Sequence, residues 1–319
     1  MTRVAVVDLG TNSTRLLVAD VADGAVVELD RRLTITRLGE GVDARRLLLP
    51  TAVARVRNVL ADYRRAIEGH GAERTLAFGT SAVRDAENGE AFLGEIEWSY
   101  GFTTRLFSGH DEALTTFRGV AAGRDVSAGT LVVDVGGGST ELILGGPDGV
   151  DLHESFDLGC VRLTERFLAS DPPAEEELEA CADFVRATLA EHVPDDVRPA
   201  HGIGVAGTVT TLATLDLGLD EEDPELVHGH RMAAEWIGSE TARLASLPVD
   251  GIRGVRGMHP GRAPVIVAGA ITIRETLAHF GLDALEASEH DIMHGAALAA
   301  AELPQPQEGD APPGAYTCC

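Results

Sequence analysis

The stretch that decides the fold is Asp8-Leu9-Gly10-Thr11-Asn12-Ser13, together with its near copy Asp134-Val135-Gly136-Gly137-Gly138-Ser139-Thr140. Each stretch follows an apolar run, Val4 to Val7 in the first case and Leu131 to Val133 in the second. Each pattern predicts a buried strand that ends at an aspartate and enters a turn rich in glycine and hydroxyl side chains. An acidic group beside backbone N–H groups suits a metal ion that bridges to phosphate oxygens. Because the pattern recurs about 126 residues later, we expect two similar halves that face one ligand.

Composition narrows the class of protein. At 319 residues the chain is long enough for two domains with hydrophobic cores. The chain contains no run of 18 apolar residues, so we expect no membrane span. The chain enters a predicted strand by the third or fourth residue, so we expect no signal peptide. The four cysteines show neither a disulfide framework nor a zinc pattern: Cys160, Cys181, Cys318 and Cys319. We therefore expect a cytoplasmic protein with no membrane partner.

The charge excludes further functions. The formal net charge is −25, and all 26 basic residues are arginine. A Walker-type phosphate loop and Schiff-base chemistry both need a lysine, so neither is possible here. A surface this acidic repels nucleic acid, so a polyanionic ligand must be drawn by a local arginine cluster or by a metal ion.

Hydrophobic periodicity predicts strands that alternate with helices in both halves. In the first half the expected strands are Val4–Asp8, Ser13–Asp20, Val26–Leu38, Thr75–Phe78 and Phe102–Phe107, and the expected helices are Thr51–Gly69, one capped by Gly79-Thr80-Ser81 and one that begins near Asp111. In the second half the expected strands are Leu131–Asp134, Ser139–Leu144, Ser155–Leu158, Ile203–Ala206 and Val265–Ala268, and the expected helices are Val161–Leu168, Glu175–His192, one that follows Gly207-Thr208-Val209-Thr210-Thr211, Ile271–Phe280 and Asp291–Glu302.

This order predicts an α/β protein with a duplicated actin-like, ribonuclease H-like two-domain fold and an interdomain cleft, as in sugar kinases, chaperones and actin. We expect a first domain over 1–124, a second over 125–303 and a disordered tail over 304–319, with the glycine-rich stretch from Gly119 to Gly129 as the crossing.

Five motifs carry a resemblance to a known family. In chain order they are Asp8–Ser13, Gly79–Ala86, Ser108–Ala113, Asp134–Glu141 and Gly204–Thr208. Together they resemble the exopolyphosphatase and guanosine pentaphosphate phosphatase (Ppx/GppA) family, over a match that runs from Val4 to about Ala301 and includes His259–Ala263 and Ser288–Asp291. The chain is similar to the short, two-domain members of that family.

The resemblance implies that Glu112 is the general base that activates the attacking water. The alternative is an ordinary acid at a helix N-terminus, and Asp111 beside it could be confused with it. The resemblance also implies that Arg84 binds phosphate oxygens as a bidentate fork. The alternative for Arg84 is an i,i+3 pair with Glu87 on a solvated helix face.

The resemblance further implies a metal site. Asp134 and Glu141 would hold Mg²⁺, or Mn²⁺ in its place, with Asp8 facing them from the first domain. The alternative for Asp8 is an aspartate that only starts its turn.

Backbone N–H groups and small polar side chains would hold the phosphates. Glycines allow a close approach to phosphate and positive φ angles, although a tight β-hairpin also favours them. The expected phosphate-binding residues are Asn12, Ser13, Thr80, Ser81, Gly136, Gly137, Gly138, Ser139, Gly207 and Thr208.

One segment departs from the family. Many relatives carry a Glu-Arg pair ahead of Pro260-Gly261-Arg262, where this chain reads Gly251-Ile252, with Arg253 following. Five histidines invite a zinc interpretation without zinc spacing: His228, His230, His259, His290 and His294.

The favoured function is release of terminal orthophosphate from inorganic polyphosphate, with guanosine pentaphosphate as a further substrate. The alternatives are a small-molecule kinase of the same fold and a regulator that binds guanosine tetra- or pentaphosphate without hydrolysis. The apolar C-terminal helix suggests that a homodimer could form.

Overall fold

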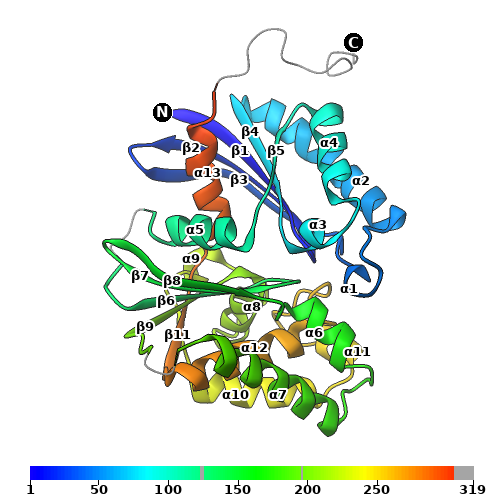
Figure 1. Cartoon of the computed structure of the whole chain (residues 1–319), viewed down its shortest axis with the longest axis vertical. Helices are drawn as coiled ribbons and strands as arrows, with labels where there is room; N and C mark the ends of the chain where they lie inside the picture. The colour runs from blue at the N-terminus through cyan, green and yellow to red at the C-terminus, as the bar shows by residue number, and fades with distance from the viewer. Residues whose placement is uncertain (123–125, 195–196, 305–319) are drawn as a thin grey trace. The chain divides into compact units, whose positions relative to one another are not determined.

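The computed structural model describes residues 1–122, 126–194 and 197–304. The chain divides into two compact units. Unit 1 takes residues 1–124 together with 292–319, and unit 2 takes residues 125–291. Each unit is built on one mixed β-sheet with helices on its faces (Figure 1).

The sheet of unit 1 has the strand order β3-β2-β1-β4-β5. The bounds are β1 Thr2–Leu9, β2 Ser13–Ala22, β3 Ala25–Ile35, β4 Arg74–Gly79 and β5 Thr103–Leu106. The central strand β1 pairs antiparallel with β2 and parallel with β4. Strands β2 and β3 are antiparallel, and β4 and β5 are parallel.

Both faces of this sheet are covered because β1 is apolar at successive positions. Ala5, Val7 and Leu9 point into one core, and Val4 and Val6 into another. The first core includes side chains of α2 and α4, and the second includes side chains of α13. The helix bounds are α1 Val42–Arg45, α2 Pro50–His70, α3 Ser81–Asp85, α4 Gly89–Tyr100, α5 Gly109–Val120 and α13 Ile292–Ala301.

The sheet of unit 2 has the order β10-β11-β9-β6-β7-β8. The strand bounds are β6 Thr130–Val135, β7 Thr140–Gly146, β8 Gly149–Phe156, β9 His201–Val205, β10 Arg231–Ala233 and β11 Ala284–Ala287. The helix bounds are α6 Cys160–Phe167, α7 Glu175–His192, α8 Ala206–Asp216, α9 Pro224–Val227, α10 Ala234–Ala245, α11 Val249–Arg253 and α12 Ile266–Phe280.

The two sheets repeat one topology. In unit 2, β6 pairs antiparallel with β7 and parallel with β9, β7 pairs antiparallel with β8, and β9 pairs parallel with β11. Strands β6, β7, β8, β9 and β11 therefore correspond to β1, β2, β3, β4 and β5. This is the duplicated actin-like α/β fold that the sequence predicts.

One predicted strand is wrong. Residues Val265–Ala268 do not form a strand, because α12 begins at Ile266 and continues to Phe280. The first two turns of α12, from Ile266 to Ile273, are buried and carry no charged side chain, so they lack the period that distinguishes helix from strand. The strand that completes the parallel part of the sheet is β11, which the sequence analysis did not predict.

The last helix belongs to unit 1 and not, as predicted, to a second domain over 125–303. In α13, Ile292, Met293 and Ala296 are buried in the core that also holds Val4 and Val6 of β1. Its small residues allow a close approach, since a Cβ at Gly295 would lie only 1.8 Å from the carbonyl oxygen of Thr115 in α5. The helix proposed as a dimer contact is therefore buried within its own unit.

The predicted crossing from Gly119 to Gly129 includes residues 123–125, which the structure does not describe. The predicted tail over 304–319 lies outside the described residues except for its first residue. None of the described helices combines the length and hydrophobicity needed to span a bilayer.

Candidate active site

The two hairpins that carry the motifs are built alike. The N–H of Gly10 donates to the carbonyl oxygen of Ser13 at 3.1 Å, and the N–H of Gly136 donates to that of Ser139 at 3.0 Å. A Cβ added to Gly10 would lie 2.9 Å from the carbonyl oxygen of Ser13, and a Cβ added to Gly136 would lie 3.2 Å from that of Ser139. Neither glycine is among the residues with positive φ, so the close turn and not a left-handed backbone requires glycine here.

Each hairpin also has its aspartate in an equivalent place, with a different neighbour. In unit 1, Asp8 lies directly opposite Arg15 on β2, and an Arg15 guanidinium nitrogen lies 2.8 Å from Asp8 Oδ2. In unit 2, Asp134 lies directly opposite Glu141 on β7. Residues in such a pair share one face of the sheet, with Cβ atoms about 4.5–5.5 Å apart.

The pair in unit 2 favours a cation. Asp134 and Glu141 are both nearly buried, and two adjacent carboxylates repel unless a proton or a cation neutralises them. Ser155, opposite Glu141 on β8, donates to Glu141 Oε1 at 2.9 Å. Mg²⁺ needs only one or two carboxylates when waters and phosphate oxygens complete its shell, so these donors fit that ion.

Two observations limit the protein's own ligand set. The described residues contain no group of three or more His, Cys, Asp or Glu side chains placed to hold a metal ion. Asp8 already accepts a hydrogen bond from Arg15 Nε at 2.8 Å. Asp134 and Glu141 are therefore better supported as ligands than Asp8.

The glycine loop of unit 2 is fixed through its carbonyl groups. Gly136 O accepts from Cys160 N at 2.9 Å, and Gly137 O accepts from Val161 N at 2.8 Å, both at the start of α6. Gly159 packs so closely that a Cβ there would lie 2.3 Å from Gly138 atoms.

The fixed loop leaves donors for an anion. Within the described residues, the N–H groups of Gly137 and Gly138 donate no hydrogen bond, although Gly138 is buried. Arg162 Nε donates to Gly138 O at 2.9 Å and so places a guanidinium beside the loop. A buried N–H without an acceptor, next to a cationic group, suits a phosphate oxygen.

Glu112 is positioned by a capped helix. Ser108 and Asp111 form a capping box at the start of α5, in which Ser108 Oγ accepts from Asp111 N at 3.1 Å and Asp111 Oδ2 accepts from Ser108 N at 3.0 Å. Hydrogen bonds from Ser108 hold the pKa of the Asp111 carboxyl below its usual value. Asp111 thus performs the helix-end role, and the buried Glu112 does not.

Arg84 reaches Glu112 from α3. Its Nη1 forms an ion pair with Glu112 Oε1 and donates to the carbonyl oxygen of Phe107 at 2.8 Å. Arg84 therefore pairs with a buried acid 28 residues away, and Glu87 lies beyond the end of α3.

Other predicted residues of unit 1 lie beside the first hairpin. Thr11 Oγ1 and Ser81 Oγ are 3.0 Å apart, which joins the hairpin to the start of α3, where Thr80 is the N-cap. Asn12 is buried, and its Nδ2 has no hydrogen-bond partner among the described residues. A buried amide donor of this kind requires an acceptor, and a phosphate oxygen would supply one. Ser13 contributes its carbonyl oxygen to the turn.

Arg262, which the sequence analysis did not assign to the site, lies against the start of α8. Ala206 has φ 67, a left-handed conformation that L residues avoid and that clusters at functional sites. A Cβ at the next residue, Gly207, would lie only 1.7 Å from the guanidinium of Arg262, so this glycine makes room for that arginine. Arg262 lies in the His259–Ala263 motif, which was the available signal.

The surroundings of this helix end are tightly packed. Burial raises the pKa of the Cys160 thiol to about 11, and Thr208 donates a hydrogen bond to that group. Burial, reinforced by Arg262, lowers the pKa of His259.

Arg253, the proposed substitute for the missing Glu-Arg pair, forms an ion pair with the exposed Asp250 on α11.

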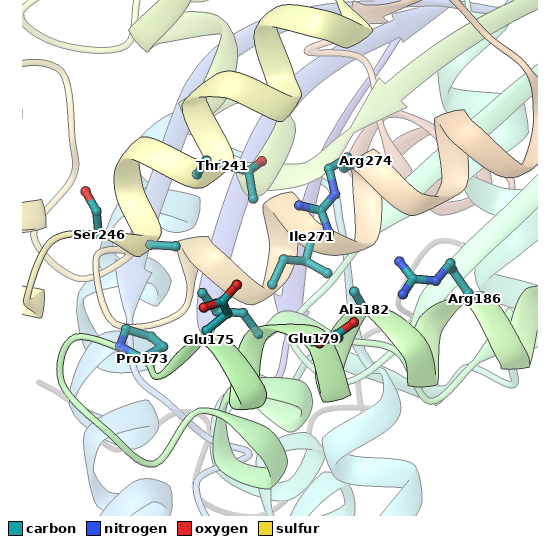
Figure 2. A pocket seen from close by; sticks show the side chains of 12 residues that line it. Pro173, Glu175, Glu179, Ala182, Arg186, Thr241, Ser246, Ile271 and Arg274 are labelled. Carbon is teal, nitrogen blue, oxygen red and sulfur yellow. The ribbon is translucent and has the colours of Figure 1, made fainter.

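A separate pocket lies in the helical layer of unit 2, away from these loops. The pocket has a volume of about 520 Å³ and is lined by residues of α7, α10 and α12. Figure 2 shows the lining side chains, among them Arg186 and Arg274. Arg186 Nη1 donates to the buried Glu275 at 3.0 Å, and Arg274 Nε donates to the same carboxylate at 2.8 Å. None of the predicted site residues lines this pocket.

The repeated sheets and their motif hairpins define a two-domain α/β protein of the actin-like class. The model of the Ppx/GppA phosphatase family matches residues 17–302, and the chain belongs to that family.

Curated relatives agree with this assignment. Exopolyphosphatase 2 of Mycobacterium tuberculosis is 40% identical over 94% of this chain and 99% of that protein. The bifunctional 3-dehydroquinate synthase/phosphatase of Fusobacterium nucleatum is 33% identical over 93% of this chain and 46% of its own length.

Solved structures agree as well. The Ppx/GppA family member of Aquifex aeolicus superimposes with a TM-score of 0.81 at 30% identity, over 94% of this chain and 98% of that one. A protein described as exopolyphosphatase-like superimposes with a TM-score of 0.87 at 34% identity, over 93% of this chain and 98% of that one.

Proposed function

We propose that this protein hydrolyses the terminal phosphoanhydride of inorganic polyphosphate and releases orthophosphate. The observation that carries the proposal is the buried Glu112, held by Arg84 from a separate helix. Membership of the Ppx/GppA phosphatase family and 40% identity to a mycobacterial exopolyphosphatase support the same reaction.

Each group has one role in the proposed reaction. Glu112 accepts a proton from water, whose oxygen attacks the terminal phosphorus while the bridging P–O bond breaks and the shortened chain leaves. Arg84, Asn12 and the N–H groups of Gly137 and Gly138 hold the oxygens of the terminal phosphoryl group. Glu112 belongs to unit 1, and the glycine loop belongs to unit 2.

Mg²⁺, or Mn²⁺ in its place, would be held by Asp134 and Glu141, with Asp8 as a further or water-mediated contact. When bound, the ion would neutralise negative charge on the phosphate oxygens. The two carboxylates meet on adjacent strands at the glycine loop, which supports this assignment. Calorimetric titration with Mg²⁺ should show binding that Asp134→Asn abolishes and that Asp8→Asn weakens less.

Guanosine pentaphosphate is a further proposed substrate, since its terminal phosphoanhydride can be cleaved by the same step. Phosphate release should be measured in parallel from short polyphosphate, long polyphosphate and guanosine pentaphosphate. We expect Glu112→Gln to lower kcat about 10²–10⁴-fold on every substrate that the wild type hydrolyses. Asp111→Asn is the matched control, because it removes a neighbouring acid that only caps the helix.

The alternatives make different predictions in the same assay. A regulator would bind guanosine pentaphosphate and release no phosphate over hours. A kinase would transfer phosphate from ATP to a hydroxyl compound and leave polyphosphate intact. A cytoplasmic location and a homodimer remain predictions, to be tested by cell fractionation and by light scattering.

A further inference from the structure

A short segment of unit 1 lies directly against the first hairpin. We call residues Thr36–Arg46 the arginine segment. The N–H groups of Thr36 and Arg37 both donate to the carbonyl oxygen of Asn12, at 3.1 and 2.9 Å, and Gly39 N donates to Thr11 O at 2.9 Å. The backbone of the arginine segment is therefore fixed to the loop that carries the proposed phosphate-binding residues.

The same segment is held on its other sides. Glu87 N donates to Arg46 O at 2.8 Å, which ties its end to the region after α3. Arg55 Nε donates to Thr36 O at 2.6 Å from α2. A Cβ at Gly39 would lie 2.3 Å from Thr11 Cγ2, so the contact with the hairpin leaves no spare space.

Three exposed arginines project from this fixed backbone: Arg37, Arg45 and Arg46. In the described part of the chain none of the three forms an ion pair, whereas most other arginines do. The acidic residues of the segment are Glu40 and Asp43. Glu40 Oε2 forms an ion pair with Arg55 Nη2 of α2 at 2.9 Å. In a chain of net charge −25, such uncompensated arginines mark a local site for an anion.

The backbone conformation supports a ligand site. Arg37 has φ 49 and Arg46 has φ 56, both in the left-handed region. This conformation costs about 1–2 kcal/mol for a residue with a Cβ, and such residues cluster at ligand-binding sites. Two of the four non-glycine residues with positive φ in the described chain thus lie in the arginine segment, where Arg46 is also the C-cap of α1.

We propose that Arg37, Arg45 and Arg46 bind the part of a polyphosphate chain that continues beyond the hydrolysed terminal group. The inference rests on the proposed function and adds a determinant of chain length to it. Polyphosphate presents repeated anionic oxygens, and the guanidinium fork can bind two of them at once. A substrate with only a few phosphates would occupy the terminal site without reaching all three arginines.

The test compares substrates of different length. We would measure kcat and KM for tripolyphosphate and for long-chain polyphosphate with wild type, Arg37→Gln, Arg45→Gln/Arg46→Gln and the triple variant. For the long chain we expect KM to rise about two- to fivefold per arginine with kcat unchanged, which is the range for one exposed charged contact. For tripolyphosphate we expect KM to change less than twofold. The control is Arg231→Gln, an exposed arginine of β10 in unit 2 without an ion pair in the described structure.

The outcomes separate the inference from the proposed function. If the wild type releases no phosphate from any polyphosphate, the proposed function is wrong. If the wild type is active but the variants raise KM equally for both lengths, the arginines only attract anions at long range, and the proposed subsite does not exist. Unchanged KM on the long chain overturns the inference as well. A slope of log KM against log salt that becomes shallower in the triple variant, for the long chain only, supports it.

Discussion

The contact between Arg84 and Glu112 predicts that these two residues are coupled in stability as well as in catalysis. Replacing Arg84 by glutamine removes the guanidinium that pairs with the Glu112 carboxylate, whose side chain is only 7% exposed. Replacing Glu112 by glutamine leaves Arg84 with the Phe107 carbonyl at 2.8 Å and with solvent, since the Arg84 side chain is 27% exposed. The two single variants should therefore differ in stability.

The magnitude follows from burial. Breaking a fully buried ion pair by removing one partner destabilises a protein by about 3–5 kcal/mol. Water can reach the position of Arg84, so we expect about 1–3 kcal/mol for Arg84→Gln. We expect at most about 1 kcal/mol for Glu112→Gln, because the arginine keeps other partners. The double variant should resemble Glu112→Gln, so the coupling energy should match the effect of Arg84→Gln alone, about 1–3 kcal/mol.

The assay is urea unfolding of the four proteins of this double-mutant cycle. The chain has two tryptophans, Trp98 in α4 of unit 1 and Trp236 in α10 of unit 2. A Trp236→Phe background therefore makes tryptophan fluorescence report on unit 1. Additive changes in the free energy of unfolding, or a Glu112→Gln variant less stable than Arg84→Gln, would refute the assignment of the pair.

Three further predictions concern unit 2. Gly207→Ala should lower kcat about tenfold, because the added Cβ displaces the guanidinium of Arg262. The free energy of unfolding should change by less than about 1 kcal/mol, because the displaced atoms are the end of a flexible side chain. An unchanged kcat would show that Arg262 does not belong to the site. Ala206→Gly should raise the free energy of unfolding by about 0.5–1 kcal/mol in urea melts by relieving the left-handed backbone, and a loss would contradict the strain. Burial raises the pKa of Cys160 and Cys181 to about 11, so in a variant without the two C-terminal cysteines neither thiol should react with a disulfide reagent at pH 8 in the folded state. Because unfolded thiols ionise near pH 9, unfolding free energy should fall between pH 9 and 11, by about 1 kcal/mol per thiol at pH 10; a flat profile would show that the thiols are exposed.

Much of the fold was predictable because its signals are local. Strands β1, β2, β6 and β7 are apolar runs that end at glycine turns, and the repeat itself predicted the duplication. The order of the strands within each sheet was not predictable, because it depends on pairing between strands that are distant in the sequence. The short strands β10 and β11 carry too few residues for a clear pattern. The apolar start of α12 predicts a strand because its first turns are buried and carry no charged side chain.

The candidate site was predictable as a set of residues and not as a set of contacts. The resemblance to the family implied Asp134, Glu141 and Glu112, and the structure places the first two opposite each other. The ion pair between Glu112 and Arg84 joins residues on two helices, and no local pattern in the sequence encodes it. The roles of these residues remain predictions.

The position of α13 affects the order in which the protein can fold during synthesis. This helix fills the core beside Val4 and Val6, yet it is translated after 291 other residues. The amino-terminal strands therefore emerge from the ribosome with one hydrophobic face uncovered, and that face stays open until the last helix arrives. Unit 2 is continuous in sequence and can complete its core first, so the half of the protein that is made first is the half that is finished last.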